Sequence, residues 1–567
     1  MIQKIKNNKW IIVIILLAAL LRLYGISRGD PLNDETLMAF RAIGMIDFDE
    51  AAYQTTPFEW FDPLVKFSPT VPDEYRIGTG IPWWAHLSWH DHPALVFAVQ
   101  HTFMSIFGDV VWAFRLPSAI WGVLSVYLIY LIGQRLYDKR AGLFAALIYA
   151  VTVNGVYISR TGMQESYVIF FILSVLYLFL LALEKDKFFI FAGVTLGLGL
   201  LAKYTVFFVT APMIGAYILV FRRDVLRSKK LWLGIAVFVV VISPSIIYNI
   251  ELYRAVGHFD FQLSYIFKQN HPAWQVEPGK DIGSLRDRMR ELIPRLIATN
   301  SWVFLGLFAI SIFSFLVSIL RNGLTTIKKH SLLMFSFVSV IVLLLVIGPS
   351  YRFLTMLAPF MALAVGVLAE NLVSRRMRCL MLFGVAVLFF EIFYSWNNQI
   401  AYYPVGSQPW LSSKVRYENY NWGYNELTKY FEKEFVGKMP ALTFDLRYQF
   451  LNQLRDDALA DGLRAGYESY PALVVYFGNF DKAGKLWSLD RLHIYHAWPV
   501  ISLQDHDEYI RINGPDYFSR SGFQDLYYVI PVNSVADARF SVLVAGLAPV
   551  EIKNPRGDTA FMVYKRK

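Results

Sequence analysis

Long apolar runs separated by short polar turns occupy roughly the first 400 residues of the chain. A transmembrane helix requires about 20 mostly apolar residues, and about eleven stretches approach that length. They cover residues 10–27, 115–134, 141–158, 167–183, 187–201, 204–221, 231–249, 301–320, 331–349, 353–372 and 379–396. The pattern predicts a polytopic α-helical membrane protein with about 11–13 transmembrane helices.

Two apolar stretches need a separate interpretation. The first run follows Lys4, Lys6 and Lys9 but is not followed by a small-residue cleavage site, so we expect a retained signal-anchor helix. Residues 93–107 are apolar but too short to cross a bilayer. We expect them to form a helix that lies at the outer membrane surface.

The pattern changes at about Tyr402, where short apolar runs alternate with polar segments. Residues 441–444, 472–477, 526–530 and 560–564 are typical of strands, and residues 425–435 and 447–462 are typical of helices. We therefore expect a transmembrane domain over residues 1–396 and a soluble extracytoplasmic α/β domain over residues 397–567.

Positive charges in the short loops predict the orientation. One set of alternate loops carries clusters of Lys and Arg, whereas the opposite turns carry a single cation each: Arg160, Lys203 and Arg352. Because cytoplasmic loops are enriched in Lys and Arg, we expect a cytoplasmic N-terminus in a multi-pass plasma-membrane protein. Residues 28–114, 250–300 and 397–567 are then external.

Composition narrows the function. The chain has 567 residues, of which 56% are hydrophobic and 17% charged, with a mean hydropathy of +0.40. These values exclude an ordinary soluble enzyme. The net charge of +10 is accounted for by membrane-protein loops and does not indicate nucleic acid. The single cysteine, Cys379, excludes an intrachain disulfide. Fingerprints of nucleotide binding, a nucleophile elbow and a zinc protease are all missing.

Ionisable residues at a membrane edge are costly and suggest function. Asn33, Asp34, Glu35 and Thr36 follow the first helix closely. The two acids are compatible with capping of the next helix. The functional interpretation is a general base at the membrane surface.

A second polar cluster precedes the short apolar run, and it has three interpretations. His86, His90, Asp91 and His92 have residue types that suit zinc. A polar cap before a helix that begins at Pro93 is the simpler explanation. Binding of an anion by His92 is the third.

Three further sites carry charges on the predicted outer side. Arg160 and Glu165 bracket one turn and form either a weak surface ion pair or the lining of a cavity. Lys203 and Arg352 stand alone between apolar runs. Each either extends to the interface or binds a phosphate at the headgroup level.

These residues occur in an order that resembles the C-type (GT-C) membrane glycosyltransferases. The resemblance is strongest to the superfamily of dolichyl-phosphate-mannose protein mannosyltransferases and lipid A aminoarabinose transferases. It is carried by residues 33–36, 91–95, 107–109, 115–119, 135–142, 159–165, 197–203 and 351–359.

The resemblance implies an inverting transfer of a hexose or pentose from a polyprenyl-phosphate donor to an acceptor hydroxyl on a protein, lipid or cell-envelope glycan. It implies Asp34 as the general base and Glu165 as a group that binds a sugar or acceptor hydroxyl. Lys203 and Arg352 would stabilise the leaving phosphate. Further candidates for substrate binding are Glu35, His92, Arg160 and Tyr351. Neither a metal nor another cofactor is expected, and the partners are substrates and membrane lipid.

Two other functions fit parts of the pattern. A lipid or solute transporter would place charges near helix midpoints and show two related halves. A non-catalytic membrane scaffold would use only the tail. The tail also contains Trp410, Trp422, Trp487 and Trp498, which suit either glycan stacking or core packing.

Overall fold

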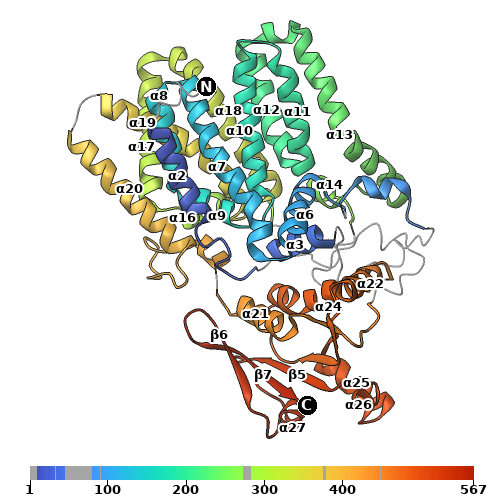
Figure 1. Cartoon of the computed structure of the whole chain (residues 1–567). Coiled ribbons are helices and arrows are strands. Elements are labelled where there is room, and N and C mark those ends of the chain that lie inside the picture. Colours follow the sequence, from blue (N-terminus) through green and yellow to red (C-terminus); the bar gives the residue numbers. More distant parts are fainter. Residues whose placement is uncertain are drawn as a thin grey trace. The chain divides into compact units, whose positions relative to one another are not determined.

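The computed structural model describes residues 9–31, 34–44, 80–89, 91–271, 283–374, 378–419, 421–446 and 449–567. Expectations for Lys4, Lys6, Asn33 and His90 lie outside these residues. The described residues form two compact units (Figure 1). The helical unit comprises the described residues within 9–27, 41–44, 82–271, 283–374 and 378–417. The sheet unit comprises described residues within 28–40, 80–81 and 418–567.

The helical unit is built almost entirely from helices. Its α-helices are α2 (Lys9–Leu23), α6 (Leu95–Phe107), α7 (Val111–Leu136), α8 (Lys139–Val151), α9 (Val153–Arg160), α10 (Glu165–Ala182), α11 (Phe188–Ala202), α12 (Thr205–Phe221), α13 (Lys229–Val256), α14 (Phe261–Phe267), α16 (Leu285–Thr299), α17 (Trp302–Asn322), α18 (Leu324–Ile347), α19 (Ala358–Ser374) and α20 (Arg378–Gln399). Short 3₁₀ helices include η2 (Trp83–Leu87), η3 (Arg223–Arg227) and η5 (Phe353–Leu357). Every apolar run predicted from the sequence is mainly helical, although residues 24–27 form a turn and Thr152 interrupts the run 141–158. The short run 93–107 contains α6.

Among the described residues, six helical segments are long and apolar enough to cross a membrane: α7, α10, α13, α17, α18 and the η5–α19 segment. A seventh span results if α8 and α9 are counted together across a 59° bend at Thr152. Helices α6, α11 and α12 are apolar but shorter. The structure confirms a polytopic helical membrane protein with a separate unit that contains a sheet.

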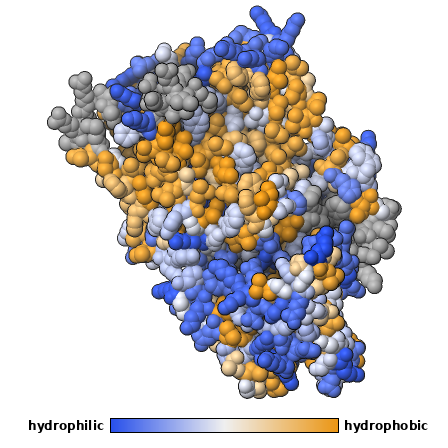
Figure 2. All heavy atoms as spheres, in the orientation of Figure 1, coloured by the Kyte–Doolittle hydropathy of each residue, from blue (hydrophilic) through white to orange (hydrophobic). Residues whose placement is uncertain are grey.

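The surface of the helical unit has the polarity expected of a membrane protein. Side chains such as Val240, Phe313, Leu320 and Phe389 are exposed, and they lie on α13, α17 and α20. Figure 2 shows these apolar flanks, with hydrophilic residues gathered at the upper end of the bundle. Lipid rather than water is the solvent that such flanks require.

Close helix packing depends on glycine at specific positions. A Cβ atom added at Gly193 of α11 would lie 2.0 Å from the carbonyl oxygen of Gly234 in α13. One added at Gly197 would lie 2.7 Å from Val241. Gly193 and Gly197 are therefore packing glycines, because a side chain at either position would collide with α13.

The sheet unit contains a five-stranded sheet with the order β4-β3-β5-β7-β6. Strands β3 (Ala472–Tyr476), β4 (Val500–Ser502) and β5 (Asp525–Pro531) are parallel. Strands β6 (Pro549–Lys553) and β7 (Thr559–Arg566) complete it in antiparallel pairing. A separate parallel pair joins β1 (Lys438–Pro440) to β2 (Glu468–Tyr470). The helices are α21 (Tyr424–Phe435), α22 (Gln449–Arg464), α23 (Lys482–Lys485), α24 (Arg491–His496), α25 (Leu503–Asn513), α26 (Tyr517–Arg520) and α27 (Ala538–Leu543).

Alternating side chains of the sheet fill two aromatic cores. Tyr527 and Val474 pack with Phe431, Phe435 and Trp498 on one face, and their neighbours in sequence pack on the other. Both faces are thus covered, which is typical of an α/β unit. Trp487 and Trp498 are core residues, whereas Trp410 and Trp422 are exposed. The strand predicted at 441–444 is wrong, because β1 ends at Pro440 and the chain then turns.

Candidate active site

Glu165, Lys203 and Arg352 meet in the helical unit, although they are far apart in sequence. Lys203 Nζ lies 2.6 Å from Glu165 Oε1, and Arg352 Nε lies 3.7 Å from the same oxygen. Both cations also lie over the ring of Phe353, at 4.8 and 5.0 Å from its centroid. We call these three charged residues the carboxylate–cation cluster.

Each member of the cluster is placed by the end of a helix. Glu165 begins α10, where the positive end of the helix dipole favours a carboxylate. Lys203 has an extended backbone that ends α11 immediately before α12 begins. Arg352 follows the end of α18, where Gly348 adopts a positive φ of 89° and Pro349 cannot continue the helix.

Burial and charge together give the cluster its chemical character. The side chain of Glu165 is 3% exposed, whereas those of Lys203 and Arg352 are 11% and 27% exposed. Two cations thus converge on one mostly buried carboxylate. Electrostatic interactions strengthen where water is partly excluded, so cations held in this way suit an anion that reaches their exposed sides.

Arg160 has a different environment. Its guanidinium donates hydrogen bonds to the backbone carbonyls of Leu21, Arg22, Tyr24 and Gly25. These carbonyls lie at the end of α2, where the last turn of a helix leaves its acceptors unsatisfied. The structure therefore gives Arg160 a capping role for α2.

His92 lies in an aromatic environment. Its ring stacks on Phe261 at 4.9 Å and meets the edge of Phe97 at 5.8 Å. The ring is buried, with 4% of the residue exposed. Tyr351, by contrast, is exposed and lies beneath the guanidinium of Arg295.

Asp91 is the centre of a buried polar network. Its carboxylate accepts hydrogen bonds from Tyr248 Oη at 2.8 Å, Phe261 N at 3.0 Å and His271 Nε2 at 2.8 Å. Its backbone has a positive φ of 65°, a conformation that Asp tolerates better than most residues. The sequence offered Asp91 only as a metal ligand or cap, since its partners lie about 160 to 180 residues further along the chain.

Asp260 belongs to the same region and was not predicted from the sequence. It caps α14 and also accepts hydrogen bonds from Tyr204 and Asn249. Burial, reinforced by the negative charge of Asp91, raises the pKa of Asp260 to about 7. Burial likewise raises the pKa of Asp91. Burial and the neighbouring His271 lower the pKa of His258 to about 4. In the part of the chain that the structure describes, no three His, Cys, Asp or Glu side chains are arranged to hold a metal ion.

Asp34 and Glu35 begin the helix α3 (Asp34–Gly44), and residues 34–40 of this helix are part of the sheet unit. Phe40, at the end of that stretch, contacts Tyr495 and Trp487 through its ring. The Tyr495 hydroxyl also donates to the Phe40 carbonyl at 3.1 Å. The two acids therefore begin a helix whose Phe40 packs against Trp487 and against Tyr495 of α24.

Asp30 is a second residue that sequence reasoning missed. Its carboxylate accepts the backbone N–H groups of Trp422, Gly423, Tyr424 and Asn425, at 2.6 to 3.3 Å. The residue is 1% exposed. Its partners lie about 390 residues away, so nothing near Asp30 in the sequence could indicate them.

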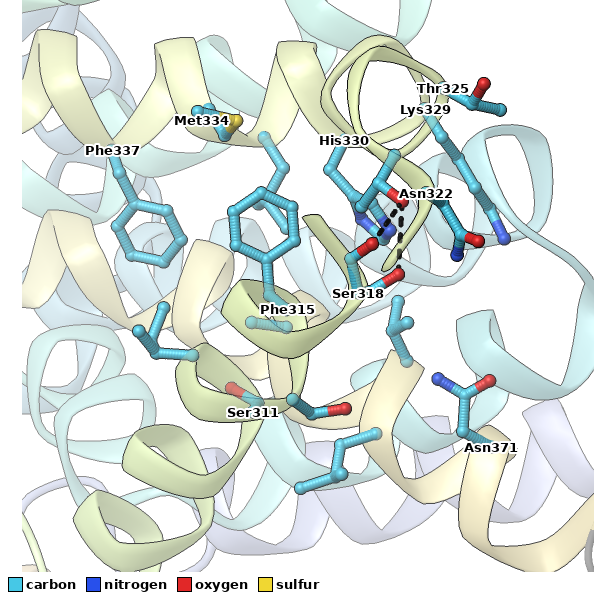
Figure 3. A pocket seen from close by; sticks show the side chains of 17 residues that line it. Ser311, Phe315, Ser318, Asn322, Thr325, Lys329, His330, Met334, Phe337 and Asn371 are labelled. Atoms are coloured by element: carbon cyan, nitrogen blue, oxygen red, sulfur yellow. Dashed lines mark hydrogen bonds between the residues drawn. The ribbon is translucent and has the colours of Figure 1, made fainter. Parts of the chain in front are cut away.

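A cavity of about 470 Å³ lies in another part of the helical unit, between α17, α18 and α19. Figure 3 shows Ser318, Lys329, His330 and Asn371 around it, with the side chains of Ser318 and Thr326 joined by a hydrogen bond. His330 is 17 residues from the end of α18 that leads to Arg352, which is about 26 Å along a helix. None of the residues predicted for the site lines this cavity.

Comparison with known proteins identifies the fold. Residues 91–248 match the family described as "Dolichyl-phosphate-mannose-protein mannosyltransferase". Two proteins of Bacillus subtilis (strain 168), named "Putative mannosyltransferase YkcB" and "Putative mannosyltransferase YycA", are 28% and 30% identical to the chain over 141 residues. That stretch makes up 24% of this chain, 20% of the first relative and 21% of the second. The chain therefore matches about a fifth of the length of each relative.

The crystal structure of ArnT from Cupriavidus metallidurans in the apo state matches 99% of this chain and 98% of its own, with a TM-score of 0.53 and 15% identity. At this identity the likeness concerns the fold. The chain therefore has the GT-C fold of the membrane glycosyltransferases that its sequence resembles.

Proposed function

We propose that the protein is a membrane glycosyltransferase that moves a sugar from a polyprenyl-phosphate donor to an acceptor hydroxyl. The observation that carries this proposal is the carboxylate–cation cluster, in which Lys203 and Arg352 converge on the buried Glu165. The family matched by residues 91–248 is described by a donor of this chemical class, and the match includes Glu165 and Lys203.

Lys203 and Arg352 would bind the donor phosphate. As the bond between the anomeric carbon and the phosphate oxygen breaks, the phosphate gains negative charge. Cations that are already in place stabilise this charge more in the transition state than in the bound donor, which is the condition for faster chemistry. Glu165 would hold both cations in position and reduce their mutual repulsion, and it is also the proposed partner of a sugar or acceptor hydroxyl.

Asp34 is the proposed general base. The acceptor hydroxyl would attack the anomeric carbon from the face opposite the phosphate, so the configuration inverts. Its proton would pass to Asp34, while the electron pair of the breaking bond leaves with the polyprenyl phosphate. Glu35, on the same turn of α3, and Tyr351, beside Arg352, are proposed to contact the substrates.

The proposed setting is a plasma membrane with a cytoplasmic N-terminus and the chemistry on the outer face. This orientation is supported by the cations in the short loops. The residues after 397 would then lie outside the cell, where a protein, lipid or cell-envelope glycan provides the acceptor hydroxyl.

The test is a transfer assay with full-length protein reconstituted in lipid. A panel of radiolabelled polyprenyl-phosphate sugars is offered with cell-envelope extract, and wild type is compared with Asp34→Asn. Asp138→Asn is the matched control, because Asp138 only caps α8 and asparagine is an equally good cap.

Transfer by wild type and Asp138→Asn that is lost in Asp34→Asn would support both the reaction and the base. Transfer that survives in Asp34→Asn would reject Asp34 and direct the search to Glu35 and Glu165. Absence of transfer from every donor, with folded protein, would overturn the proposed function and favour a transporter, which flux assays would then test.

A further inference from the structure

The sheet unit contains a cavity of about 440 Å³ that the proposed chemistry does not use. Its size is within the range of about 300–1,000 Å³ typical of small-molecule sites. Asn479 follows the end of β3, Asn533 follows the end of β5, and Asn554 follows the end of β6, so these residues lie at one edge of the sheet. The carboxyl ends of parallel strands are a common position for ligand sites in α/β folds.

Trp422 also lines the cavity, on a loop whose backbone is anchored by hydrogen bonds. The four backbone N–H groups that bind Asp30 belong to Trp422 and the three residues after it. Gly423 has a φ of 105°, and a Cβ atom there would lie 2.5 Å from the Cβ of Ala560. The backbone that carries Trp422, a residue 44% exposed, is therefore already ordered, which lowers the cost of binding.

Two polar side chains that line the cavity are oriented by hydrogen bonds. Asn554 Oδ1 accepts the N–H groups of Arg556 and Asp558 at 3.0 and 3.1 Å, which orients its amide. Asp481 Oδ1 accepts the N–H of Gly484 at 2.9 Å, so its carboxylate is similarly oriented. Rigid donors and acceptors of this kind favour a ligand whose hydroxyl groups both donate and accept hydrogen bonds.

The charge of the lining argues against an anion. Among the described residues that line the cavity there is one carboxylate, Asp481, and neither Lys nor Arg. The remaining polar groups are mainly amides, from Asn421, Asn479, Asn533 and Asn554. A phosphate, a nucleotide or an acidic polymer would meet no compensating charge here. A neutral polyhydroxyl compound with a flat apolar face matches both the amides and the tryptophan.

We propose that this cavity binds a neutral carbohydrate, with Trp422 stacking on a sugar ring and the asparagine amides and Asp481 contacting its hydroxyls. The cavity would hold part of a glycan that extends beyond the reacting hydroxyl. Only this last step, the identification of the glycan as acceptor or product, rests on the proposed function. Binding of the carbohydrate does not depend on it.

The experiment measures binding of trisaccharides to full-length protein in nanodiscs by saturation-transfer NMR and calorimetry. Mannotriose, maltotriose and chitotriose are the neutral probes, and trigalacturonate is the anionic probe. Trp422→Ala removes the stacking surface but keeps the backbone N–H that Asp30 binds. Trp410→Ala is the matched control, since Trp410 is 56% exposed and does not line the cavity.

We expect at least one neutral trisaccharide to bind, with at least tenfold weaker binding to Trp422→Ala and unchanged binding to Trp410→Ala. Asn533→Ala should weaken binding several-fold, and trigalacturonate should bind worst. The inference is overturned if no neutral probe binds, if trigalacturonate binds best, or if Trp422→Ala binds like wild type. Thermal melting of each variant verifies that the sheet unit is folded.

The transfer assay separates this inference from the proposed function. Normal transfer with a KM for glycan acceptors that is the same in Trp422→Ala and wild type would reject the acceptor role alone. Carbohydrate binding that depends on Trp422, without any transfer from polyprenyl-phosphate donors, would reject the proposed function and leave the carbohydrate site standing.

Discussion

Two sets of cations in the helical unit are easily confused in the sequence and differ sharply in the structure. Arg160 and Arg22 bind helix ends: Arg160 donates to carbonyls at the end of α2, and Arg22 donates to the carbonyls of Tyr149 and Ala150 near the end of α8. Lys203 and Arg352 instead share one carboxylate, Glu165.

The difference between the two sets lies in their partners. Backbone carbonyls are neutral, fixed acceptors, and a guanidinium that satisfies several of them has its donors occupied for structural reasons. Lys203 and Arg352 are instead held by a charged side chain, and both keep an exposed side that a ligand can reach. Lone charges at membrane edges thus separate into helix caps and candidate binding groups only when their partners are known.

Among these substitutions, we expect replacement of Lys203 to have the largest effect on sugar transfer. Lys203→Met removes one of the two cations at the proposed phosphate site, and we expect kcat/KM of sugar transfer to fall by about 10²- to 10³-fold. Lys203→Arg keeps the charge and should retain much more activity. Activity of Lys203→Met close to that of wild type would show that Lys203 has a structural role similar to that of Arg160.

Arg160→Met should affect stability rather than substrate binding. It leaves the carbonyls at the end of α2 without their donor, and we expect a loss of about 3 kcal/mol in the free energy of unfolding. Denaturation in detergent measures this loss, and the KM for donor should stay near the wild-type value in protein that remains folded. Full stability with a raised donor KM would instead make Arg160 a phosphate-binding residue.

Arg352→Lys should have a smaller effect, because the charge is retained. The guanidinium lies over the ring of Phe353, 5.0 Å from its centroid, and close to Met163, and a lysine lacks this planar group. We expect the donor KM to increase by about tenfold, equivalent to about 1.4 kcal/mol, with little change in thermal stability. An increase confined to kcat would contradict a role in binding the donor.

The smallest expected effect concerns Asp260, which, unlike Glu165, lies in a buried site with another carboxylate. Its pKa is about 7 in the folded protein and near 4 in the unfolded chain. Between these pH values Asp260 is already deprotonated in the unfolded chain but still protonated in the folded protein. Its contribution therefore lowers the stability of the folded protein increasingly as pH rises.

Asp260→Asn keeps the cap of α14 but cannot titrate. The melting temperature of wild type minus that of the variant should therefore decrease from pH 4.5 to pH 7.5. The contribution of His258 to stability rises with pH over part of this range. Because His258 is present in both proteins, its contribution cancels in the difference. A difference that is constant with pH would contradict the assigned pKa.

The sequence was sufficient for features that depend on local chemistry. Apolar runs became helices because a chain in lipid must satisfy its backbone internally. The strands at 472–476 and 525–531 followed from their alternation and β-branched or aromatic side chains. The 59° bend at Thr152 was not predicted, and its nearest marker in the sequence is Gly155, where a Cβ atom would lie 2.8 Å from the Tyr149 carbonyl oxygen.

For the candidate site, the sequence identified residues but not their pairing. Lys203 and Arg352 were singled out as lone cations on one predicted side of the membrane, yet their convergence on Glu165 results from the packing of α10, α11 and η5. Asp30 and Asp260 gave no local signal. Their partners are supplied by the tertiary fold, and the roles of Asp34 and Glu35 stay predictions.

The contact between Asp30 and the loop at Trp422 has a consequence for how the protein is made. The two ends of this contact are separated by 392 residues. At about 5–20 residues per second, the ribosome would deliver Trp422 some 20–80 s after Asp30. Asp30, which precedes α3, therefore gains these hydrogen-bond partners only after all the intervening helices have been synthesised. The sheet unit is consequently completed only after the helical unit has been synthesised, and a ribosome that stalls before residue 422 leaves Asp30 without these partners.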